Sequence, residues 1–234
     1  MPNQNDHHIS HRYDQELEAL RDDVLNMGSK VEEQIENAVR ALTEGNNDMA
    51  ETTIREDHAL NAMEVAADEK AVSLLARRTP AARDLRFVMT AIKTITDLER
   101  MGDEAEKIAR MAQQLNSTKP IKRHTALTSM SEAVRNQTRQ ALDCLASMDA
   151  DVALRVHGQD EKVDEMFEGI FRELLTYMME DSRNISSTID ILFVAKALER
   201  IGDHCKNITE YVIYMVHGKD VRHTDVDSLD LDTP

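Results

Sequence analysis

The chain has 234 residues, with 28 lysines and arginines against 44 aspartates and glutamates, so its formal net charge is −16. Its hydrophobic content of 41% excludes a disordered chain, while 7 glycines and 4 prolines are too few for the many turns of a β-sandwich or a doubly wound sheet. The acidic balance excludes a general nucleic-acid-binding protein, which needs clustered lysine and arginine. The composition predicts an all-α protein whose counterparts are metal ions or basic surfaces.

The two cysteines and the hydropathy of the chain predict a cytoplasmic protein. Cys144 and Cys205 stand far apart, form no CxxC pair and follow no recognisable leader peptide, so we expect both to be buried in a reducing compartment. No uncharged apolar stretch reaches the roughly 18 residues that a membrane span needs, since even the run 185–195 contains Asp190. Any association with a membrane is therefore expected only through a partner.

Breaks in the helical pattern divide the chain into six segments of roughly 25 to 35 residues, long enough for the helices of a bundle. The breaks lie at 45–47, 79–80, 117–120, 147–149 and 181–184. Asp149 and Ser182 are residues of the kind that cap a helix N-terminus. In the last segment the apolar residues are spaced alternately by three and four, as in a helix packed in a bundle. They are Ile191, Val194, Leu198, Ile201, Cys205, Ile208, Val212 and Met215.

The second half of the chain repeats the first. The block LERMGD at 98–103 recurs as LERIGD at 198–203, and the likeness extends upstream into the second helical segment of each half. Short turns make neighbouring helices antiparallel. The duplication therefore predicts an all-α fold of two tandem antiparallel three-helix bundles, with six long helices.

The breaks and the duplication together predict the domain boundaries. The two terminal segments contain little that a core would bury, so we expect them to be flexible. In chain order, the predicted units are an N-terminal segment (1–11), a first bundle (12–116), a linker (117–121), a second bundle (122–217) and an acidic tail (218–234).

Two pairs of acids lie one turn apart in the repeated block: Glu99 with Asp103, and Glu199 with Asp203. Side chains four residues apart project from the same side of a helix, so each pair can hold a divalent cation. In the last helix, the apolar spacing places Glu199 and Asp203 away from the side that packs in the bundle. We therefore expect this pair to face solvent or a partner.

The repeated block also places a glycine inside each helix, at Gly102 and at Gly202. Glycine within a helix costs about 1 kcal/mol relative to alanine. Its presence at both positions predicts that another helix approaches the backbone closely there.

Further oxygen ligands are predicted on the second helix of each half, again four residues apart. They are Asp57 with Asn61, and Asp160 with Asp164. Oxygen ligands alone suit hard cations such as Mg²⁺, Mn²⁺, Ca²⁺ or oxidised iron, although zinc or nickel could occupy such a site in vitro. His204 adjoins Asp203 but points about 100° away around the helix, so we do not expect it to be a ligand.

Three other interpretations of these acids stay open from the residues alone. They are ordinary acids on a solvated helix face, a metal-free surface that docks basic partners, or part of a metal-dependent enzyme of the helical carboxylate type. An enzyme of this type would need buried acids that converge. The chain has no Glu-x-x-His or HExxH motif, no Walker loop and no nucleophile elbow, so no catalytic residue is predicted.

Taken together, several blocks in the chain resemble the PhoU family of bacterial phosphate-signalling proteins, over residues 8–223. The resemblance implies a cytoplasmic, non-enzymatic regulator that represses the phosphate regulon when phosphate is plentiful. The blocks that carry it are the two LER[IM]GD sequences, His8–His11, Tyr13–Leu17, Met63–Ala66, Asp84–Met89 and Thr176–Arg183.

The resemblance also implies the partners of the protein. They are the ATPase subunit of the phosphate ABC transporter and the sensor histidine kinase of the phosphate two-component system, which the protein would bridge. We expect a homodimer that binds no nucleic acid and reaches the membrane only through these partners.

Some members of the family hold multinuclear metal clusters on E(D)xxxD motifs. Carried over to this chain, these motifs are Glu99 with Asp103 and Glu199 with Asp203, and Asp160 with Asp164 fits as well. The metal would be Fe, Mn, Mg, Zn or Ni. In the first half Asn61 replaces an acid beside Asp57, which predicts weaker metal binding there.

Overall fold

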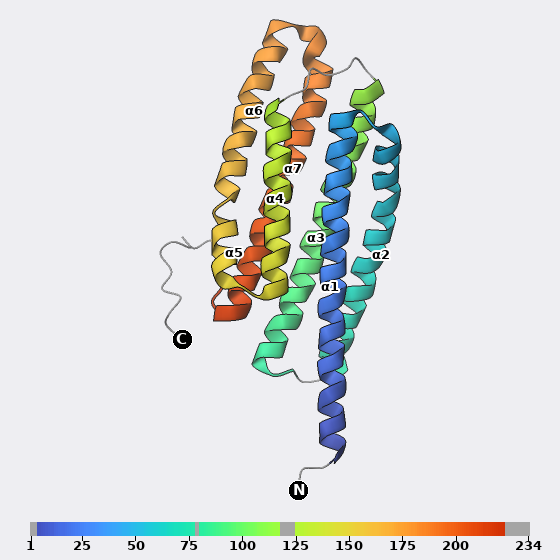
Figure 1. The fold of residues 1–234 in the computed structure, drawn as a ribbon, viewed down its shortest axis with the longest axis vertical. Helices are drawn as coiled ribbons and strands as arrows, with labels where there is room; N and C mark the ends of the chain where they lie inside the picture. The colour runs from blue at the N-terminus through green and yellow to red at the C-terminus, as the bar shows by residue number, and fades with distance from the viewer. Residues whose placement is uncertain (1–3, 78–79, 118–124, 223–234) are drawn as a thin grey trace.

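The computed structural model describes residues 4–77, 80–117 and 125–222, with side chains from residue 12 onward. Every secondary-structure element in these ranges is helical, which confirms the predicted fold class (Figure 1). In chain order the elements are α1 (Gln4–Glu44), α2 (Asn47–Arg77), α3 (Ala82–Ser117), α4 (Thr125–Ser147), α5 (Ala150–His157), α6 (Asp160–Glu180), the 3₁₀-helix η1 (Ser182–Asn184) and α7 (Ile185–His217).

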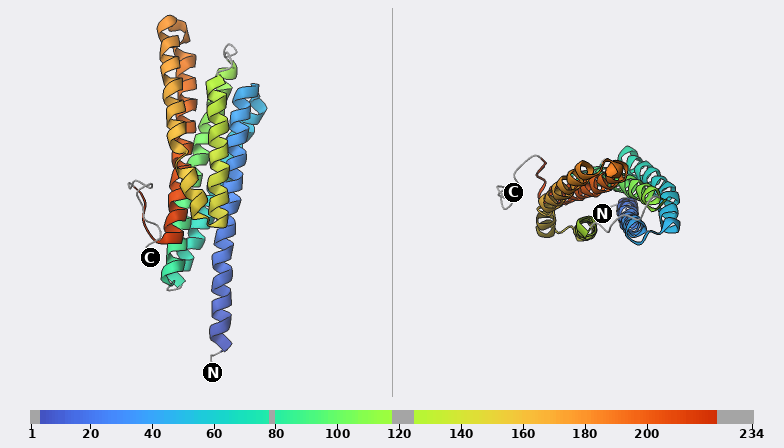
Figure 2. Two further views of the ribbon diagram at one scale, coloured as in Figure 1. Left: turned by 60° about the vertical axis from the view of Figure 1, so that its left-hand side comes forward. Right: turned by 90° about the horizontal axis from the view of Figure 1, so that it is seen from above.

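The helices form two three-helix bundles that lie side by side (Figure 2). Helices α1, α2 and α3 pack against one another, and α7 packs against α4, α5 and α6. The fifth predicted helix is interrupted at Gly158–Gln159, so α5 and α6 together occupy the place that α2 has in the first bundle. Of the predicted linker and flexible ends, 118–121, 1–3 and 223–234 lie outside the described residues.

The two bundles meet through their third helices, α3 and α7, which run antiparallel. At this interface the buried carboxylate of Asp97 on α3 accepts hydrogen bonds from His204 Nδ1 (2.8 Å) and Asn207 Nδ2 (3.2 Å) of α7. Nearby, Arg200 of α7 lies 2.8 Å from Glu104 of α3. The bundles are thus joined by buried polar contacts as well as by apolar packing.

The apolar spacing of the last helix was a reliable guide to its packing. All the residues it selected are buried except Met215, which is half-buried. Cys144 and Cys205 are both buried and free, and burial raises the pKa of each thiol to about 12. None of the described helices has a stretch long and apolar enough to cross a membrane.

The two predicted caps had different outcomes. The side chain of Asp149 accepts a hydrogen bond from the backbone N–H of Val152 at the start of α5, as expected for a cap. The prediction for Ser182 was wrong by one residue, because Asp181 caps η1 by accepting from the N–H of Arg183. The extra 3₁₀-helix separates this cap from α7.

Both glycines of the repeated block sit where a neighbouring helix approaches closely, as predicted. A Cβ at Gly102 would collide with Cδ2 of the fully buried Leu60 on α2. At Gly202 a Cβ would lie 3.2 Å from Gln137 Oε1 and 3.3 Å from Val163 Cγ1. In each bundle neighbouring helices therefore lie close to the backbone of the third helix beside the acids of the repeated block.

Candidate functional site: two carboxylate clusters

The acids of α2 and α3 gather into what we call the first carboxylate cluster. Burial, followed by repulsion from neighbouring acids, raises the pKa values of Asp57, Glu64 and Glu99. The cluster consists of Asp57, Glu64, Asp68, Glu99, Asp103 and Glu106.

Asp57 is the most deeply placed member of the first cluster, with 6% of its surface exposed. Its Oδ2 accepts a hydrogen bond from Asn61 Nδ2 (3.1 Å). Its Oδ1 and the Oδ1 of Asn61 are both buried and lack a hydrogen-bond partner within the described part of the chain. Buried oxygens without a donor are costly, so this pair offers two oxygens that a cation would satisfy.

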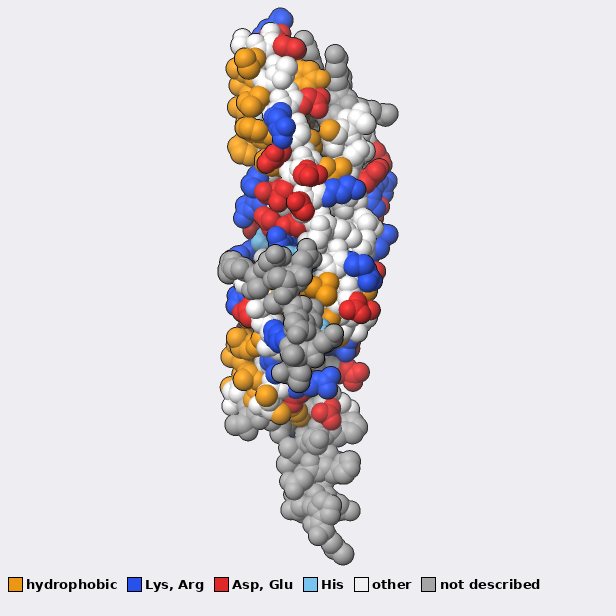
Figure 3. Space-filling view, turned by 90° about the vertical axis from the view of Figure 1, so that its left-hand side faces the viewer, with side chains coloured by type: hydrophobic (Ala, Val, Ile, Leu, Met, Phe, Trp, Pro, Cys, Tyr) orange, Lys and Arg blue, Asp and Glu red, His pale blue; other side chains and the backbone are white. Residues whose placement is uncertain are grey.

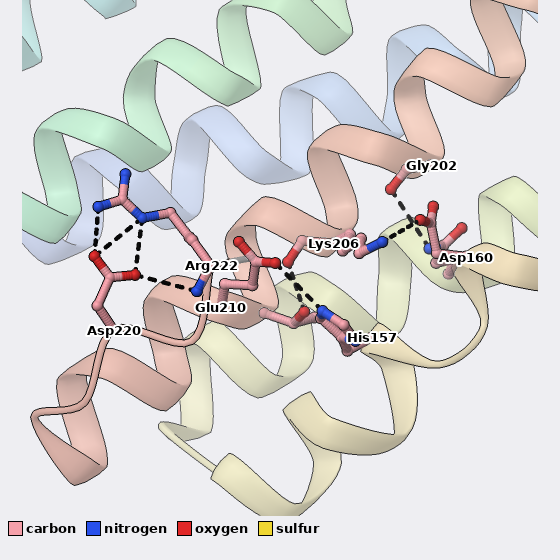
Figure 4. Close-up of polar contacts among 9 residues, drawn as sticks. His157, Asp160, Gly202, Lys206, Glu210, Asp220 and Arg222 are labelled. Carbon is pink, nitrogen blue, oxygen red and sulfur yellow. Dashed lines mark hydrogen bonds and ion pairs between the residues drawn. The ribbon is translucent and has the colours of Figure 1, made fainter. Parts of the chain in front are cut away.

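The second carboxylate cluster consists of Asp160 and Asp164 on α6 with Glu199 and Asp203 on α7. Partial burial of its carboxylate, followed by repulsion from the other three acids, raises the pKa of Asp203 to about 6. Two lysines of α7 reach into this cluster. Lys206 Nζ lies 2.9 Å from Asp160 Oδ2 (Figure 4), and Lys196 Nζ lies 2.5 Å from Glu199 Oε1.

The lysines make the two clusters chemically different. In the alignment of the repeated blocks, Thr96 and Glu106 take the places of Lys196 and Lys206. The first cluster has six acids, and the ion pair that the structure describes for it is that of Glu106 with Arg110. The second has four acids, two of which are paired with lysine. Negative charge is therefore much less compensated in the first cluster.

The predicted site residues come together within each bundle, so they form two separate sites. Of the pair predicted to face solvent or a partner, Asp203 is exposed but Glu199 is largely covered. Asp164 and Asp203 are exposed, but Asp57 and Asp160 are buried, and only 13% of the Glu199 side chain is exposed. The helical spacing did not show that Glu199 is largely covered on the side where it lies close to Asp164 of α6. As the side chains stand, no three described acids, histidines or cysteines converge on one point where an ion would be held.

Sequence reasoning missed the residues around the acids. Gln34 and Gln137 are buried beside Gly102 and Gly202, and each has an amide oxygen without a partner in the described structure. The pairing of Lys196 and Lys206 with the acids was missed too. A signal for the lysines was available, because they flank the second LER[IM]GD block and the equivalent positions of the first block lack them.

His204 is not directed at the second carboxylate cluster, as expected, since its ring pairs with Asp97 at the interface between the bundles. It lines a cleft of about 580 Å³ between α5, α7 and the segment after α7 (Figure 4). The cationic side chains of this cleft already have carboxylate partners: Arg200 with Glu104, Lys206 with Asp160, and Arg222 with Asp220. With its positive charge neutralised in this way, the cleft is not built as an anion site.

Comparison with known proteins identifies the family. The model of the PhoU domain matches residues 24–112 and again residues 127–212, one match in each bundle. The phosphate-specific transport system accessory protein PhoU of Escherichia coli K12 is 45% identical over 223 residues, which cover 95% of this chain and 92% of that protein. The PhoU homolog of Pseudomonas putida is 46% identical over 218 residues, covering 93% and 85%.

Two solved structures share the fold. The crystal structure of PhoU from Pseudomonas aeruginosa superposes with a TM-score of 0.86 at 43% sequence identity, and covers 88% of this chain and 100% of that one. The phosphate transport system regulatory protein PhoU from Streptococcus pneumoniae gives a TM-score of 0.83 at 30% identity, covering 89% and 99%.

Proposed function

The chain belongs to the PhoU family of accessory regulators of phosphate transport, which are not enzymes, and we propose that it represses phosphate-starvation signalling and lowers phosphate uptake from the cytoplasm. In this proposal it bridges the ATPase subunit of the phosphate ABC transporter and the sensor histidine kinase of the phosphate two-component system. The observation that carries the proposal is the 45% identity over 95% of the chain with an accessory protein of phosphate-specific transport.

A bridging role is supported by the duplicated architecture. Each bundle carries one carboxylate cluster between its second and third helices, so the molecule has two acidic regions in equivalent places that differ in charge. Two surfaces of this kind allow two different partners to bind the same molecule. We also propose a homodimer, which sedimentation equilibrium at micromolar protein concentration would test.

We propose further that the first carboxylate cluster binds a hard divalent cation, with Asp57 and Glu99 as ligands. The support is the unpaired buried oxygen of Asp57 and the small compensation of charge around it. This reverses the prediction that Asn61 weakens the first site, because the side-chain oxygen of Asn61 is itself an available ligand. Fe, Mn and Mg fit this oxygen set best, and Zn and Ni less well.

Equilibrium dialysis with Mn²⁺ tests the metal proposal. We expect the wild type to retain Mn²⁺ and the variant Asp57→Asn/Glu99→Gln to lose most of it. If the wild type retains none while partner binding is intact, the acids are a metal-free docking surface.

A phosphate-starvation reporter in phosphate-replete cells tests the regulatory proposal. A deletion strain is complemented with the wild type or with a variant in which Glu99, Asp103, Glu199 and Asp203 are all changed to alanine. We expect repression by the wild type and loss of repression by the variant when both are present at equal levels. Failure of the wild type to repress would overturn the proposed function, and equal repression by both would exclude the carboxylates from it.

A further inference from the structure

The far end of the α6–α7 hairpin carries an apolar surface that nothing in the described structure covers. On each helix the residues recur every four positions, so they lie along one face. Their exposed fractions range from 37% at Ile189 to 87% at Met179. Figure 3 shows hydrophobic side chains gathered in a column on this end of the molecule. We call this surface the apolar hairpin face; it consists of Phe171, Leu175, Met179, Ile185, Ile189 and Phe193.

The first bundle keeps exposed apolar residues at three of the six equivalent positions, Val72, Leu85 and Met89, and lacks a large apolar residue at the other three. The repeat alignment places Asp68 opposite Phe171, Lys93 opposite Phe193 and the small Ala76 opposite Met179. Packing of the bundle therefore does not require large apolar residues at these positions. Large exposed apolar patches of this kind mark interaction sites.

The apolar hairpin face continues directly into the second carboxylate cluster. On α6 the exposed Asp164 lies about two turns before Phe171, and on α7 the exposed Asp203 lies about five turns after Ile185, on the same side of the helix. Lys196 joins the two regions, since its Nζ pairs with Glu199 and lies 5.3 Å from the ring centre of Phe167. In Figure 3 acidic side chains adjoin the apolar column on the side toward the middle of the molecule.

We propose that this surface docks an amphipathic helix of a partner protein. The apolar stripe of that helix would lie along the apolar hairpin face, and lysines or arginines at one end would reach Asp164 and Asp203. Burial of the apolar face of an amphipathic helix against an apolar surface is a common mode of peptide recognition. The inference rests on the proposed function, in which the protein acts through protein partners. It specifies where one partner binds and the kind of helix with which that partner binds.

The charges argue against the other occupants. A second copy docked antiparallel would place the hairpin tip against the carboxylate cluster, and the tip's Arg183 is already held by both oxygens of Asp181. A second copy docked parallel would place acid against acid. An anionic membrane surface would repel Asp164, Asp203 and a chain of net charge −16.

Two synthetic peptides test the proposal by fluorescence anisotropy. Both are helical, about 20 residues long to span the surface, and carry a leucine stripe; one ends in four lysines and the other in four glutamates. We expect the wild type to bind the lysine peptide at least tenfold more tightly than the glutamate peptide. The variant Asp164→Asn/Asp203→Asn should lose this preference while still binding both.

The decisive variant is Leu175→Glu/Ile189→Glu, and its matched control is Val65→Glu/Val216→Glu. The control residues lie on α2 and near the end of α7, outside the face, and are 56% and 46% exposed. We expect the first variant to weaken binding of the lysine peptide at least tenfold and the control to change it less than twofold. Thermal unfolding verifies that both variants fold, which their exposure leads us to expect.

Two results of the peptide assay would overturn the inference: equal binding of the lysine peptide by both variants, or tighter binding of the glutamate peptide by the wild type. It would also be overturned if Leu175→Glu/Ile189→Glu dissociated a dimer that the wild type forms, or if phosphatidylcholine–phosphatidylglycerol vesicles captured the wild type. The reporter assay separates this inference from the proposed function. If the wild type does not repress although peptide binding depends on the face, the proposed function fails and the docking surface stands. If the wild type represses and peptide binding does not depend on the apolar hairpin face, only the proposal of the docking surface fails.

Discussion

The two bundles have one architecture and two different surfaces. Both place a buried glutamine on the first helix, a buried aspartate on the second and a glycine on the third where neighbouring helices lie close: Gln34, Asp57 and Gly102, and correspondingly Gln137, Asp160 and Gly202. Outside this shared centre they differ, since the first bundle has more unpaired acid and the second has two lysines and a more extensive exposed apolar face. The comparison teaches that close packing requires the same residues at the centre of both bundles, while exposed positions can differ and serve different binding roles.

The largest expected effect concerns the interface between the bundles, which is itself asymmetric. Asp97 is buried against α7, whereas the equivalent position of the second bundle is Ala197. The substitution Asp97→Ala leaves His204 and Asn207 without their acceptor, so we expect it to lower the free energy of unfolding by about 3 kcal/mol in urea titrations.

The matched control is Arg200→Ala at the same interface. Glu104 keeps a second ion pair with Lys107 (2.9 Å), so this substitution should lower the free energy of unfolding by about 1 kcal/mol or less. Equal losses for Asp97→Ala and Arg200→Ala would show that the buried hydrogen bonds do not hold the bundles together.

The glycines provide a direct comparison of packing in the two bundles. In Gly102→Ala the new Cβ collides with the buried Leu60, so we expect a loss of about 2 kcal/mol even after the gain in helix propensity. In Gly202→Ala the nearest atoms are 3.2 and 3.3 Å away, so strain and helix propensity should nearly cancel. Urea unfolding of the two variants measures the difference, and an equal effect would contradict it.

The pH dependence of stability tests whether Lys196 and Lys206 fully compensate the negative charge of the second cluster. The pKa of Asp203 is raised in the folded state to about 6 from 3.8, so the folded chain binds more protons than the unfolded chain between these values. Stability from this group is therefore greatest below about pH 4, falls as the pH rises toward about 6 and is constant above that.

Replacing Asp203 with asparagine should remove this dependence. We expect Asp203→Asn to raise the free energy of unfolding at pH 7 by about 1 kcal/mol, because solvent screens an exposed carboxylate, and to leave it unchanged at pH 4. Asp151→Asn, an exposed acid on α5 outside the cluster, is the control. Destabilisation by Asp203→Asn at pH 7 would show that the carboxylate is held by favourable contacts instead.

Much of the fold could be predicted because helix packing requires apolar residues at a regular spacing along the sequence. The spacing from Ile191 to Val212 gave the buried side of α7, and the duplicated block gave two bundles and the close approach at its glycines. The break at Gly158–Gln159 was not predicted, since helical spacing resumes immediately after it.

The candidate site could be predicted only in part. The i,i+4 spacing correctly grouped acids that share a helix, but the period of a single helix does not show what another helix covers, so the burial of Asp160 and Glu199 was missed. The pairing of Lys206 with Asp160 was missed for the same reason, because it joins α7 to α6. It is this pairing that separates the two clusters chemically.

The central claim is that the two carboxylate clusters differ in charge and therefore in metal binding. The most direct test exchanges the residues at positions 106 and 206 between the clusters and measures Mn²⁺ binding by electron paramagnetic resonance titration. The variant Glu106→Lys gives the first cluster the residue of the second, and Lys206→Glu does the reverse, with Glu106→Gln as the control for loss of an acid. We predict that Glu106→Lys weakens Mn²⁺ binding about tenfold, more than Glu106→Gln does, and that Lys206→Glu adds a second site. Unchanged binding in Glu106→Lys, together with no added site in Lys206→Glu, would contradict the account.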